Sequence, residues 1–170
     1  MDIEQCTKPT ITAINGIALS GGCEIVMDCD IHFASSRAKI GQTELNVSIL
    51  PGVGGTQRLT QLVGLGRAMQ MILTGEPMDA LTAFPYDLIT QVTEPEALMD
   101  AALTLAQRLI VKSPITLRLA KLAVRKGAKT NFSTAFQLKL LCQSVLFSTR
   151  DHLEGFNAFL EKRPPEYRGK

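Results

Sequence analysis

The chain has 170 residues, of which 45% are hydrophobic and 20% are charged, enough to bury the core of a globular domain. Its net charge of +2, from 18 basic and 16 acidic residues, argues against a nucleic-acid-binding protein, which needs a concentrated basic face. No run of about 18 apolar residues is present, so we expect no membrane span. The N-terminal sequence MDIEQCTKPT lacks the pattern of a secretory signal, so we expect a cytoplasmic protein, or a mitochondrial matrix protein in a eukaryote.

The cysteines and the first histidine carry no sign of a metal site or of a disulfide framework. Cys6, Cys23, Cys29 and Cys142 form no CxxC pair and have no histidine cluster nearby. We therefore expect reduced thiols and no bound metal. His32 has no evident partner ligand, which favours a hydrogen-bonded or an exposed histidine.

The first part of the chain alternates strand and helix patterns. Residues 10–18 are rich in β-branched residues and predict two short strands, or one strand broken at Asn15-Gly16. A helix is expected from residues 19–22 to about Asp28, and a strand at 30–34. This strand–helix–strand order favours an α/β fold.

The pattern changes along the rest of the chain. Residues 38–50 predict no single structure, and the following segments predict helices at 57–63, 67–73 and 77–83 and a buried strand at 88–92. From residue 95, apolar residues recur at three- and four-residue spacing, which predicts helices over about 98–109, from Pro114 onward, and at 133–147 and 151–161. We therefore divide the chain into a mixed α/β part, 1–94, and a helical part, 95–170.

The first stretch that could carry chemistry is Ala18-Leu19-Ser20-Gly21-Gly22-Cys23-Glu24. Adjacent glycines at a helix start cost on the order of 1 kcal/mol each relative to alanine, so a ligand close to the bare backbone is one explanation for them. Free N–H groups there can bind an anion or an oxyanion. The other explanation is close packing by the glycines, with a glutamate that suits a helix N-terminus.

A second stretch combines a carboxylate with a glycine-rich turn. Gly41-Gln42-Thr43-Glu44 is followed by Pro51-Gly52-Val53-Gly54-Gly55, which matches neither the Walker loop nor the dinucleotide fingerprint. Taken alone, Glu44 is a carboxylate in a loop.

A third feature is a basic stretch, which predicts a solvated helix face or a contact for the phosphates of a nucleotide-bearing ligand. Its members are Lys112, Arg118, Lys121, Arg125, Lys126 and Lys129.

Together, the first two stretches resemble the crotonase (enoyl-CoA hydratase/isomerase) family. The segment KPTITAINGIALSGGCEIVMDCDIHFASSRAKIGQTELNVSILPGVGGTQRL is similar to the signature region of that family, and the similarity continues through GRAMQMILTG to STRDHLEGFNAFLEKRPPEYRGK. The resemblance is greatest to enoyl-CoA hydratases. It implies an α/β crotonase-type ββα spiral, of which 1–94 would form the later turns with the catalytic glutamates. Residues 95–170 would form a C-terminal helical oligomerisation region that builds homo-oligomers, as trimers or hexamers.

The resemblance also implies a reaction and its residues. Glu24 and Glu44 match the two glutamates that flank a water in hydratases, Gly21 matches the oxyanion N–H donor, and Gly52 matches a glycine that contacts the water. The implied reaction is syn addition of water to a 2-enoyl-CoA thioester, as in fatty acid β-oxidation, with acyl-coenzyme A as substrate and no further cofactor. Two adjacent carboxylates can act as one base and one acid, and backbone donors can stabilise the enolate.

The sequence departs from the family pattern in three places. Family members begin with a further segment, about a third of a full chain, that supplies the other oxyanion donor and much of the coenzyme A groove. Loss of one such donor typically lowers the rate by about 10²- to 10³-fold, so we expect weak or no activity from this chain alone. Ser48 and Asp87 stand where glycine is usual, which puts the local backbone geometry in question.

Two alternatives to a general enoyl-CoA hydratase follow. In the first, the chain is a non-catalytic, truncated crotonase-like subunit or fragment that acts in assembly. In the second, it is a hydratase for a branched, methylglutaconyl-type acyl-CoA. The acyl pocket that would discriminate the substrates lies largely in the preceding segment of family members.

Overall fold

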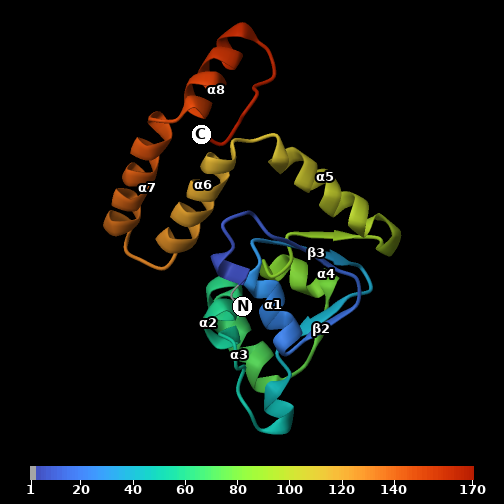
Figure 1. Ribbon diagram of the computed structural model, residues 1–170. Helices are drawn as coiled ribbons and strands as arrows, with labels where there is room; N and C mark the ends of the chain where they lie inside the picture. The colour runs from blue at the N-terminus through green and yellow to red at the C-terminus, as the bar shows by residue number, and fades with distance from the viewer. Residues whose placement is uncertain (1–2) are drawn as a thin grey trace. The chain divides into compact units, whose positions relative to one another are not determined.

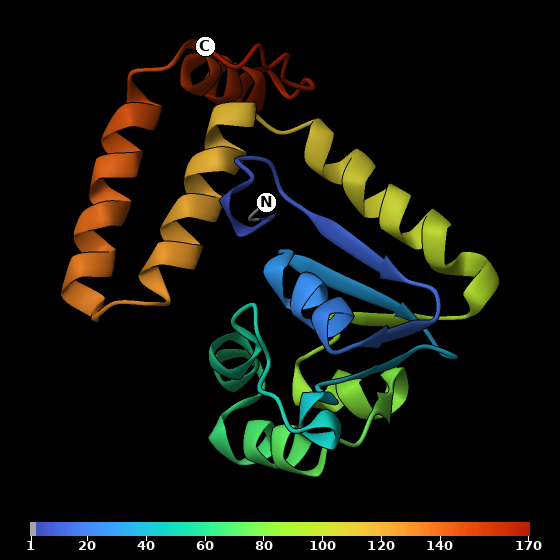
Figure 2. The ribbon, with the colours of Figure 1, turned by 60° about the horizontal axis from the view of Figure 1, so that its bottom comes forward.

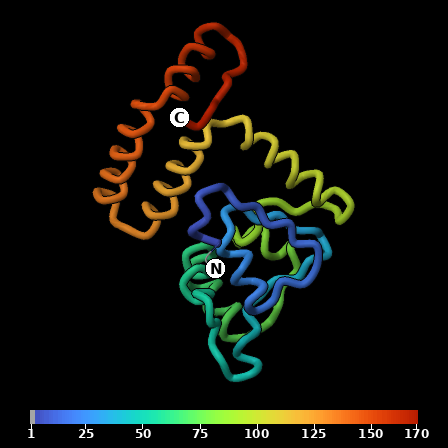
Figure 3. The backbone as a smooth tube through the Cα atoms, in the orientation of Figure 1, coloured from blue at the N-terminus to red at the C-terminus, as the bar shows by residue number. Residues whose placement is uncertain are grey.

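The computed structural model describes residues 3–170 and divides the chain into two compact units. The first unit comprises residues up to 6 together with 10–105, and the second comprises 7–9 together with 106–170. Figures 1 and 3 trace the chain from its blue N-terminal end to its red C-terminal end. The boundary at residue 105 lies inside a helix, and the division at residue 94 stays a prediction.

The first unit contains two three-stranded sheets. In one, β1 (Ile11–Ile14), β3 (Ile31–Ser35) and β6 (Gln91–Thr93) are parallel, in the order β1-β3-β6. In the other, the order is β2 (Ile17–Leu19), β4 (Lys39–Gly41) and β5 (Met78–Asp79), with β2 and β4 parallel and β5 antiparallel.

The two strands expected on either side of Asn15-Gly16 exist, but they do not pair with each other. β1 pairs with β3 and β2 pairs with β4, so the Asn15-Gly16 dipeptide carries the chain from one sheet to the other and forms no hairpin. The parallel pairing of Leu19 with Gly41 brings the end of β2 beside the end of β4. Residues that follow these two strands therefore begin close together.

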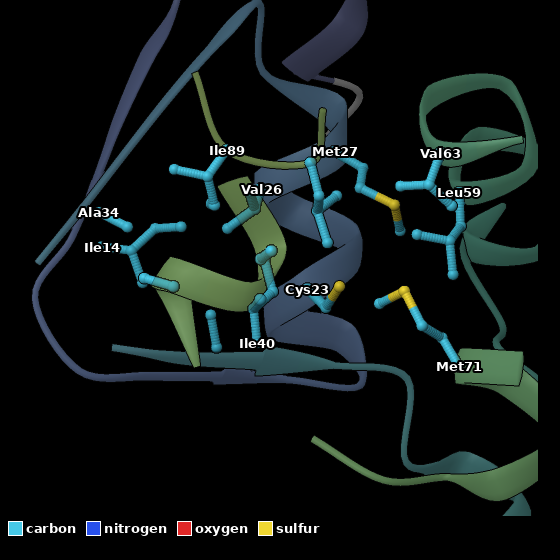
Figure 4. Packing of buried hydrophobic residues seen from close by; sticks show 14 of the residues in the cluster. Ile14, Cys23, Val26, Met27, Ala34, Ile40, Leu59, Val63, Met71 and Ile89 are labelled. Carbon is cyan, nitrogen blue, oxygen red and sulfur yellow. The ribbon is translucent and has the colours of Figure 1, made fainter. Parts of the chain in front are cut away.

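Three helices complete the core of this unit: α1 (Gly21–Asp28), α2 (Gly55–Val63) and α3 (Leu65–Thr74). They confirm the helices expected in these regions. Figure 4 shows Cys23, Val26 and Met27 of α1 among the buried side chains. The largest buried apolar side chains of this core are those of Ile40, Leu59, Met71, Leu88 and Ile89.

Short elements account for the differences from the expected secondary structure. The segment 38–50 contains β4 and the 3₁₀ helix η2 (Glu44–Val47). The segment expected as one helix at 77–83 begins instead as β5, after which α4 (Ala80–Ala83) follows with Asp79 as its N-cap. The remaining 3₁₀ turns are η1 (Ile3–Gln5), η3 (Phe84–Tyr86) and η4 (Pro95–Ala97).

In the segment expected as a buried strand at 88–92, only Leu88 and Ile89 are buried, and the regular strand begins at Gln91. Leu88 and Thr90 contact His32 instead: the His32 ring Nδ1 lies 2.9 Å from the Leu88 carbonyl oxygen, and the His32 N–H donates to Thr90 Oγ1 at 3.1 Å. His32 Nε2 lies 3.2 Å from the Cys29 carbonyl oxygen, so both ring nitrogens face a carbonyl group. This histidine is buried and hydrogen-bonded.

Helix α5 (Leu98–Ile110) covers one side of the parallel sheet. Its Leu98 and Ala102 form a second small core with Phe33 of β3, which lies on the face of the sheet away from the main core. The apolar spacing that predicted this helix is therefore the spacing of its sheet-facing side.

The second unit is helical and consists of α6 (Pro114–Gly127), α7 (Phe132–Phe147) and α8 (Arg150–Glu161). Figures 1 and 2 show α6 and α7 side by side, joined by a short turn. Each helix begins at a side-chain cap, which agrees with the expected helix starts. The capping residues are Ser113, Asn131 and Thr149.

The end of the second unit folds back on the start of α8. Both oxygens of the buried Asp151 carboxylate accept backbone N–H groups, from Arg168 at 2.8 Å and from Gly169 at 3.0 Å. Burial alone would raise the pKa of this carboxyl, but these hydrogen bonds and one with Ser113 lower it below its usual value. None of the helices in the described residues is long and apolar enough to cross a membrane.

Candidate active site

The site begins at an unusual turn between β2 and α1. Ser20 has φ 50° and ψ −122°, the geometry of the first central residue of a type II′ turn, which normally favours glycine. Its N–H donates to the Gly41 carbonyl at 2.9 Å, and its hydroxyl lies 2.6 Å from the Thr43 hydroxyl. These bonds tie the start of α1 to the segment that leads to Glu44.

The turn presents the first N–H of helix α1. Gly21 is the first residue of α1, and among the described residues its N–H has no hydrogen-bond partner. A Cβ at Gly21 would meet nothing within 4 Å, so the backbone is open on that side. A free, exposed N–H at a helix N-terminus can donate to a negatively charged oxygen.

Glu24 lies one turn into α1 and is only 3% exposed. Its Oε1 accepts the N–H groups of Val53 and Gly55, both at 2.7 Å. The glycine-rich turn at 51–55 therefore holds the Glu24 carboxylate by its backbone. Two short bonds from N–H groups to one oxygen fix this side chain and leave its second oxygen for other partners.

Gly55 is at the point of closest approach in this arrangement. A Cβ there would lie 2.9 Å from Glu24 Oε1, 2.9 Å from Pro51 Cβ and 2.8 Å from the Gln42 side-chain amide. Real Cβ atoms do not approach other atoms so closely, so the three side chains could not keep these positions around an alanine. The glycine thus permits Glu24 and Gln42 to converge.

Glu44 is the first residue of η2 and is 6% exposed. The Gln42 amide lies next to it, 3.1 Å from both carboxylate oxygens, in the orientation in which the amide NH₂ donates to them. The opposite orientation would place the amide oxygen against two acceptors, so the donating orientation is the favourable one. Among the described residues neither Glu24 nor Glu44 has a cationic partner.

The Cys23 thiol is affected by the charges of both carboxylates. It is fully buried and hydrogen-bonds the Gln42 side chain. Burial is the main cause that raises the pKa of this thiol, to about 12, and the negative charges of Glu44 and Glu24 add to it. The thiol therefore remains protonated at neutral pH.

Arg58 of α2 supports the turn that holds Glu24. Its guanidinium donates to the Val53 carbonyl oxygen, and its Nη2 lies 2.7 Å from Asp28 Oδ1 and 3.0 Å from Glu4 Oε2. Asp28 is one turn beyond Glu24 on α1. Arg58 thus connects the helix that carries Glu24 with the turn whose N–H groups bind it.

The structure brings three of the four candidate residues into one region and places the fourth beside them. The Gln42 amide bonds Glu44 and, like the Glu24 carboxylate, lies against Gly55, and Gly21 begins the helix that carries Glu24. Gly52 is exposed in the turn directly before Val53, with open space where a Cβ would lie. The roles of these four residues stay predictions. The basic stretch after residue 112 belongs to the second unit, mainly on α6.

The chain is similar to known proteins along its whole length. The sequence matches the enoyl-CoA hydratase/isomerase family over residues 1–170. The chain belongs to this family. It is 42% identical over 164 residues to a short-chain-enoyl-CoA hydratase of Clostridium acetobutylicum and 42% identical over 168 residues to a crotonyl-CoA hydratase of Syntrophomonas wolfei. It is 40% identical over 173 residues to the mitochondrial methylglutaconyl-CoA hydratase of mouse.

The crotonase fold that the sequence predicted is confirmed. A crystal structure of an enoyl-CoA hydratase from Bacillus anthracis superposes with a TM-score of 0.97 at 41% identity, over 99% of this chain and 65% of that one. The three relatives above are matched over 96%, 99% and 99% of this chain. The chain spans 63%, 65% and 55% of the length of those relatives, respectively.

Both positions where the sequence departs from the family's glycines have a left-handed backbone. Ser48 ends η2 at φ 59° and ψ 34°, and Asp87 follows η3 at φ 64° and ψ 11°. Each residue therefore adopts a conformation that glycine would take without strain. The departures change the residue type and leave the turn geometry in place.

Residue-level reasoning missed several members of the site. The roles of Gln42, Cys23 and Gly55 depend on contacts across the fold, although Gly55 lies in the glycine-rich turn that the sequence singled out. Ser20 carried no signal at all, because serine is not typical of its φ and ψ.

Proposed function

We propose that this chain carries the catalytic half of an enoyl-CoA hydratase, which adds water syn across the double bond of a 2-enoyl-CoA thioester. The observation that carries the proposal is the pair of buried carboxylates, Glu24 and Glu44, which lie near one buried thiol and have no cationic partner among the described residues. Buried carboxylates without such partners are unusual unless they serve a reaction. The names of the related hydratases support the same reaction.

In the proposed reaction the two glutamates act on one water molecule. One carboxylate accepts a proton from the water as its oxygen attacks Cβ of the enoyl group, and the other group, in its acid form, protonates Cα. The backbone bonds of Glu24 and the amide bonds of Glu44 hold the two side chains from different sides. The same residue type can then perform both steps because the two environments differ.

The Gly21 N–H is the proposed donor to the thioester oxygen. Negative charge develops on that oxygen as the enolate forms, and an N–H at the start of α1 is aligned with the positive end of the helix dipole. The exposed Gly52 in the neighbouring turn is proposed to contact the water. Acyl-coenzyme A would be the substrate, with no other cofactor needed for this chemistry.

The test is hydration of crotonyl-CoA, followed by loss of the enoyl absorbance, for the chain and for Glu24→Gln and Glu44→Gln. Each substitution removes one proton-transfer group and keeps its size. We expect each to lower kcat by about 10²- to 10⁴-fold, the usual contribution of such a group. Asp100→Asn, an amidation of an exposed carboxylate on α5, serves as the matched control and should leave the rate unchanged.

Two outcomes would contradict the proposal. If the folded chain gives no turnover even at high concentration, the reading as a non-catalytic subunit or fragment gains. If it turns over and the glutamate variants do so equally well, the two carboxylates are not the acid and base. The chain spans only part of the length of its relatives, so an assembly role is tested by mixing it with a full-length hydratase and measuring the mass of the product. A mass equal to that of a mixed complex would identify an assembly role.

The substrate class can be resolved within the same assay. We propose a short, unbranched enoyl group, because two short-chain or crotonyl hydratases are slightly more similar to the chain than the methylglutaconyl-CoA hydratases are. A kcat/KM for crotonyl-CoA above that for 3-methylglutaconyl-CoA supports this choice. The reverse order would assign the chain to the branched substrate.

We also propose that the chain self-associates through its C-terminal helices, as a trimer or hexamer. Apolar side chains occur around the whole circumference of α7, and those of Phe132, Leu141 and Phe147 are exposed, as is Phe159 of α8. Exposed apolar area of this extent is typical of an interface. Light scattering coupled to size exclusion gives the mass directly, and a monomer at micromolar concentration would contradict the proposal.

We further propose that the protein is located in the cytoplasm or the mitochondrion, because its relatives include bacterial and mitochondrial proteins.

A further inference from the structure

Gln42 is a buried polar residue that takes no part in the proton transfers of the proposed reaction. It follows the last residue of β4, is 1% exposed, and stands two residues before Glu44. A buried amide must be hydrogen-bonded to be tolerated in a core. The partners of this amide therefore indicate what it does.

The Gln42 amide has two side-chain partners. Its NH₂ group donates to both oxygens of Glu44, at 3.1 Å each. The Cys23 thiol also forms a hydrogen bond with the Gln42 side chain. The amide thus connects the Glu44 carboxylate to helix α1.

The chemistry of an amide suits this position. An amide donates hydrogen bonds without carrying a charge, whereas a lysine or arginine there would neutralise Glu44 and a carboxylate would repel it. Its orientation is determined by Glu44, because rotation by 180° would place the amide carbonyl against the Glu44 oxygens. Cys23 is the residue immediately before Glu24, so one chain of bonds sets both glutamates relative to the same helix.

We propose that Gln42, which also bonds the Cys23 thiol, is a positioning residue that holds the Glu44 carboxylate in the geometry the hydration requires. The catalytic part of this inference rests on the proposed function, whereas the hydrogen-bonded chain from Cys23 through Gln42 to Glu44 does not. Gly55 is part of the same arrangement, because only a residue without a Cβ leaves room for the Gln42 amide beside Glu24.

Nuclear magnetic resonance tests the chain of bonds without any activity. The side-chain NH₂ signals of Gln42, assigned by their loss in Gln42→Met, should move in Glu44→Ala far more than in Glu24→Ala, and should exchange with solvent more slowly than those of the exposed Gln57. The proposal would be overturned if the Gln42 signals do not shift in Glu44→Ala, or if they exchange with solvent as fast as those of Gln57.

Kinetics then test the positioning role. Gln42→Met should lower kcat for crotonyl-CoA by about 10- to 100-fold and leave KM within about twofold, because Glu44 remains present but is misplaced. Gln57→Met is the matched control, and an equal loss there, or a loss confined to KM, would refute the role. Cys23→Ser keeps a hydrogen-bonding group beside the amide and should lose less kcat than Cys23→Ala, a difference that packing alone would not produce.

The two hypotheses fail separately. If the wild-type chain shows no turnover, the proposed function of this chain fails, while the magnetic resonance result still decides whether Gln42 holds Glu44. If turnover is present and Gln42→Met has full kcat, the positioning role fails and the hydratase assignment stands.

Discussion

Gly55 donates its N–H to Glu24 Oε1 at 2.7 Å, while the position that a Cβ would occupy on the same residue lies 2.9 Å from that oxygen. The backbone of α2 therefore lies so close to the Glu24 carboxylate that a residue with a Cβ would not fit at this position. The short hydrogen bond requires this close approach, and the close approach requires a residue without a Cβ. The glycine at position 55 is thus explained by the carboxylate that its N–H binds.

Gly55→Ala should destabilise the first unit by about 1–3 kcal/mol, because Glu24, Pro51 and the Gln42 amide must all shift to admit the methyl group. Urea denaturation followed by circular dichroism measures the change. Gly52→Ala in the same turn is the control for stability, since nothing lies within 4 Å of its Cβ position. Equal effects of the two substitutions would show that crowding at Glu24 is not responsible.

Ser48→Gly should stabilise the chain by about 0.5–1 kcal/mol. Serine at φ 59° is strained by roughly 1–2 kcal/mol, and relief of this strain exceeds the extra entropy that glycine gives the unfolded chain. Asp87→Gly should gain less, because aspartate tolerates the left-handed region better than serine does. Thermal unfolding of both variants measures the order, and a loss of stability in Ser48→Gly would mean that the serine side chain makes a contribution larger than its strain.

The fold was predictable wherever a long, regular pattern was present. The helices α5 to α8 have bounds that agree with the expected ranges within a few residues, and α6 to α8 begin at side-chain caps. The strands β4 and β5 have three and two residues, too few for any alternation to appear. Their pairing with β2 depends on contacts that the local sequence does not contain.

The site was predictable only through the combination of its motifs. Glu24 and Glu44 are each unremarkable alone, and their roles came from the resemblance of two stretches to one family. The partnership of Gln42 with Glu44 could not be predicted, because it depends on the direction in which a buried amide points. The strained backbone of Ser20 was also hidden, since its conformation is imposed by bonds to Gly41 and Thr43.

Arg58→Met should destabilise the first unit by about 1–3 kcal/mol, because it leaves the buried Asp28 without its closest cation and removes a bond to the turn at Val53. A double-mutant cycle with Asp28→Asn separates the ion pair from the other contacts of the guanidinium. If the two substitutions are additive, the ion pair contributes nothing and the support of the turn accounts for the effect.

Cys23 should resist alkylation in the native protein. With its pKa raised to about 12 by burial, roughly one thiol in 10⁴ is ionised at pH 8, and the thiolate is the reactive form. Treatment with iodoacetamide followed by peptide mass spectrometry should show early labelling of the exposed Cys6 and labelling of Cys23 only in urea. Modification of both at similar rates in the native protein would mean that α1 opens readily.

Asp151→Asn should destabilise the second unit by about 1–3 kcal/mol at pH 7, since an amide cannot accept the N–H groups of both Arg168 and Gly169. The pKa of this carboxyl is lower in the folded state than its ordinary value of 3.8, so its contribution to stability is full above about pH 4. That contribution is lost as the pH falls through the lowered folded-state pKa. The difference in urea midpoint between wild type and variant should therefore be large at pH 7 and shrink progressively below pH 4. Amidation of the exposed Asp100 on α5 should change the midpoint little at either pH. A difference between wild type and Asp151→Asn that is independent of pH would show that the carboxylate is not ionised in its contact with the backbone.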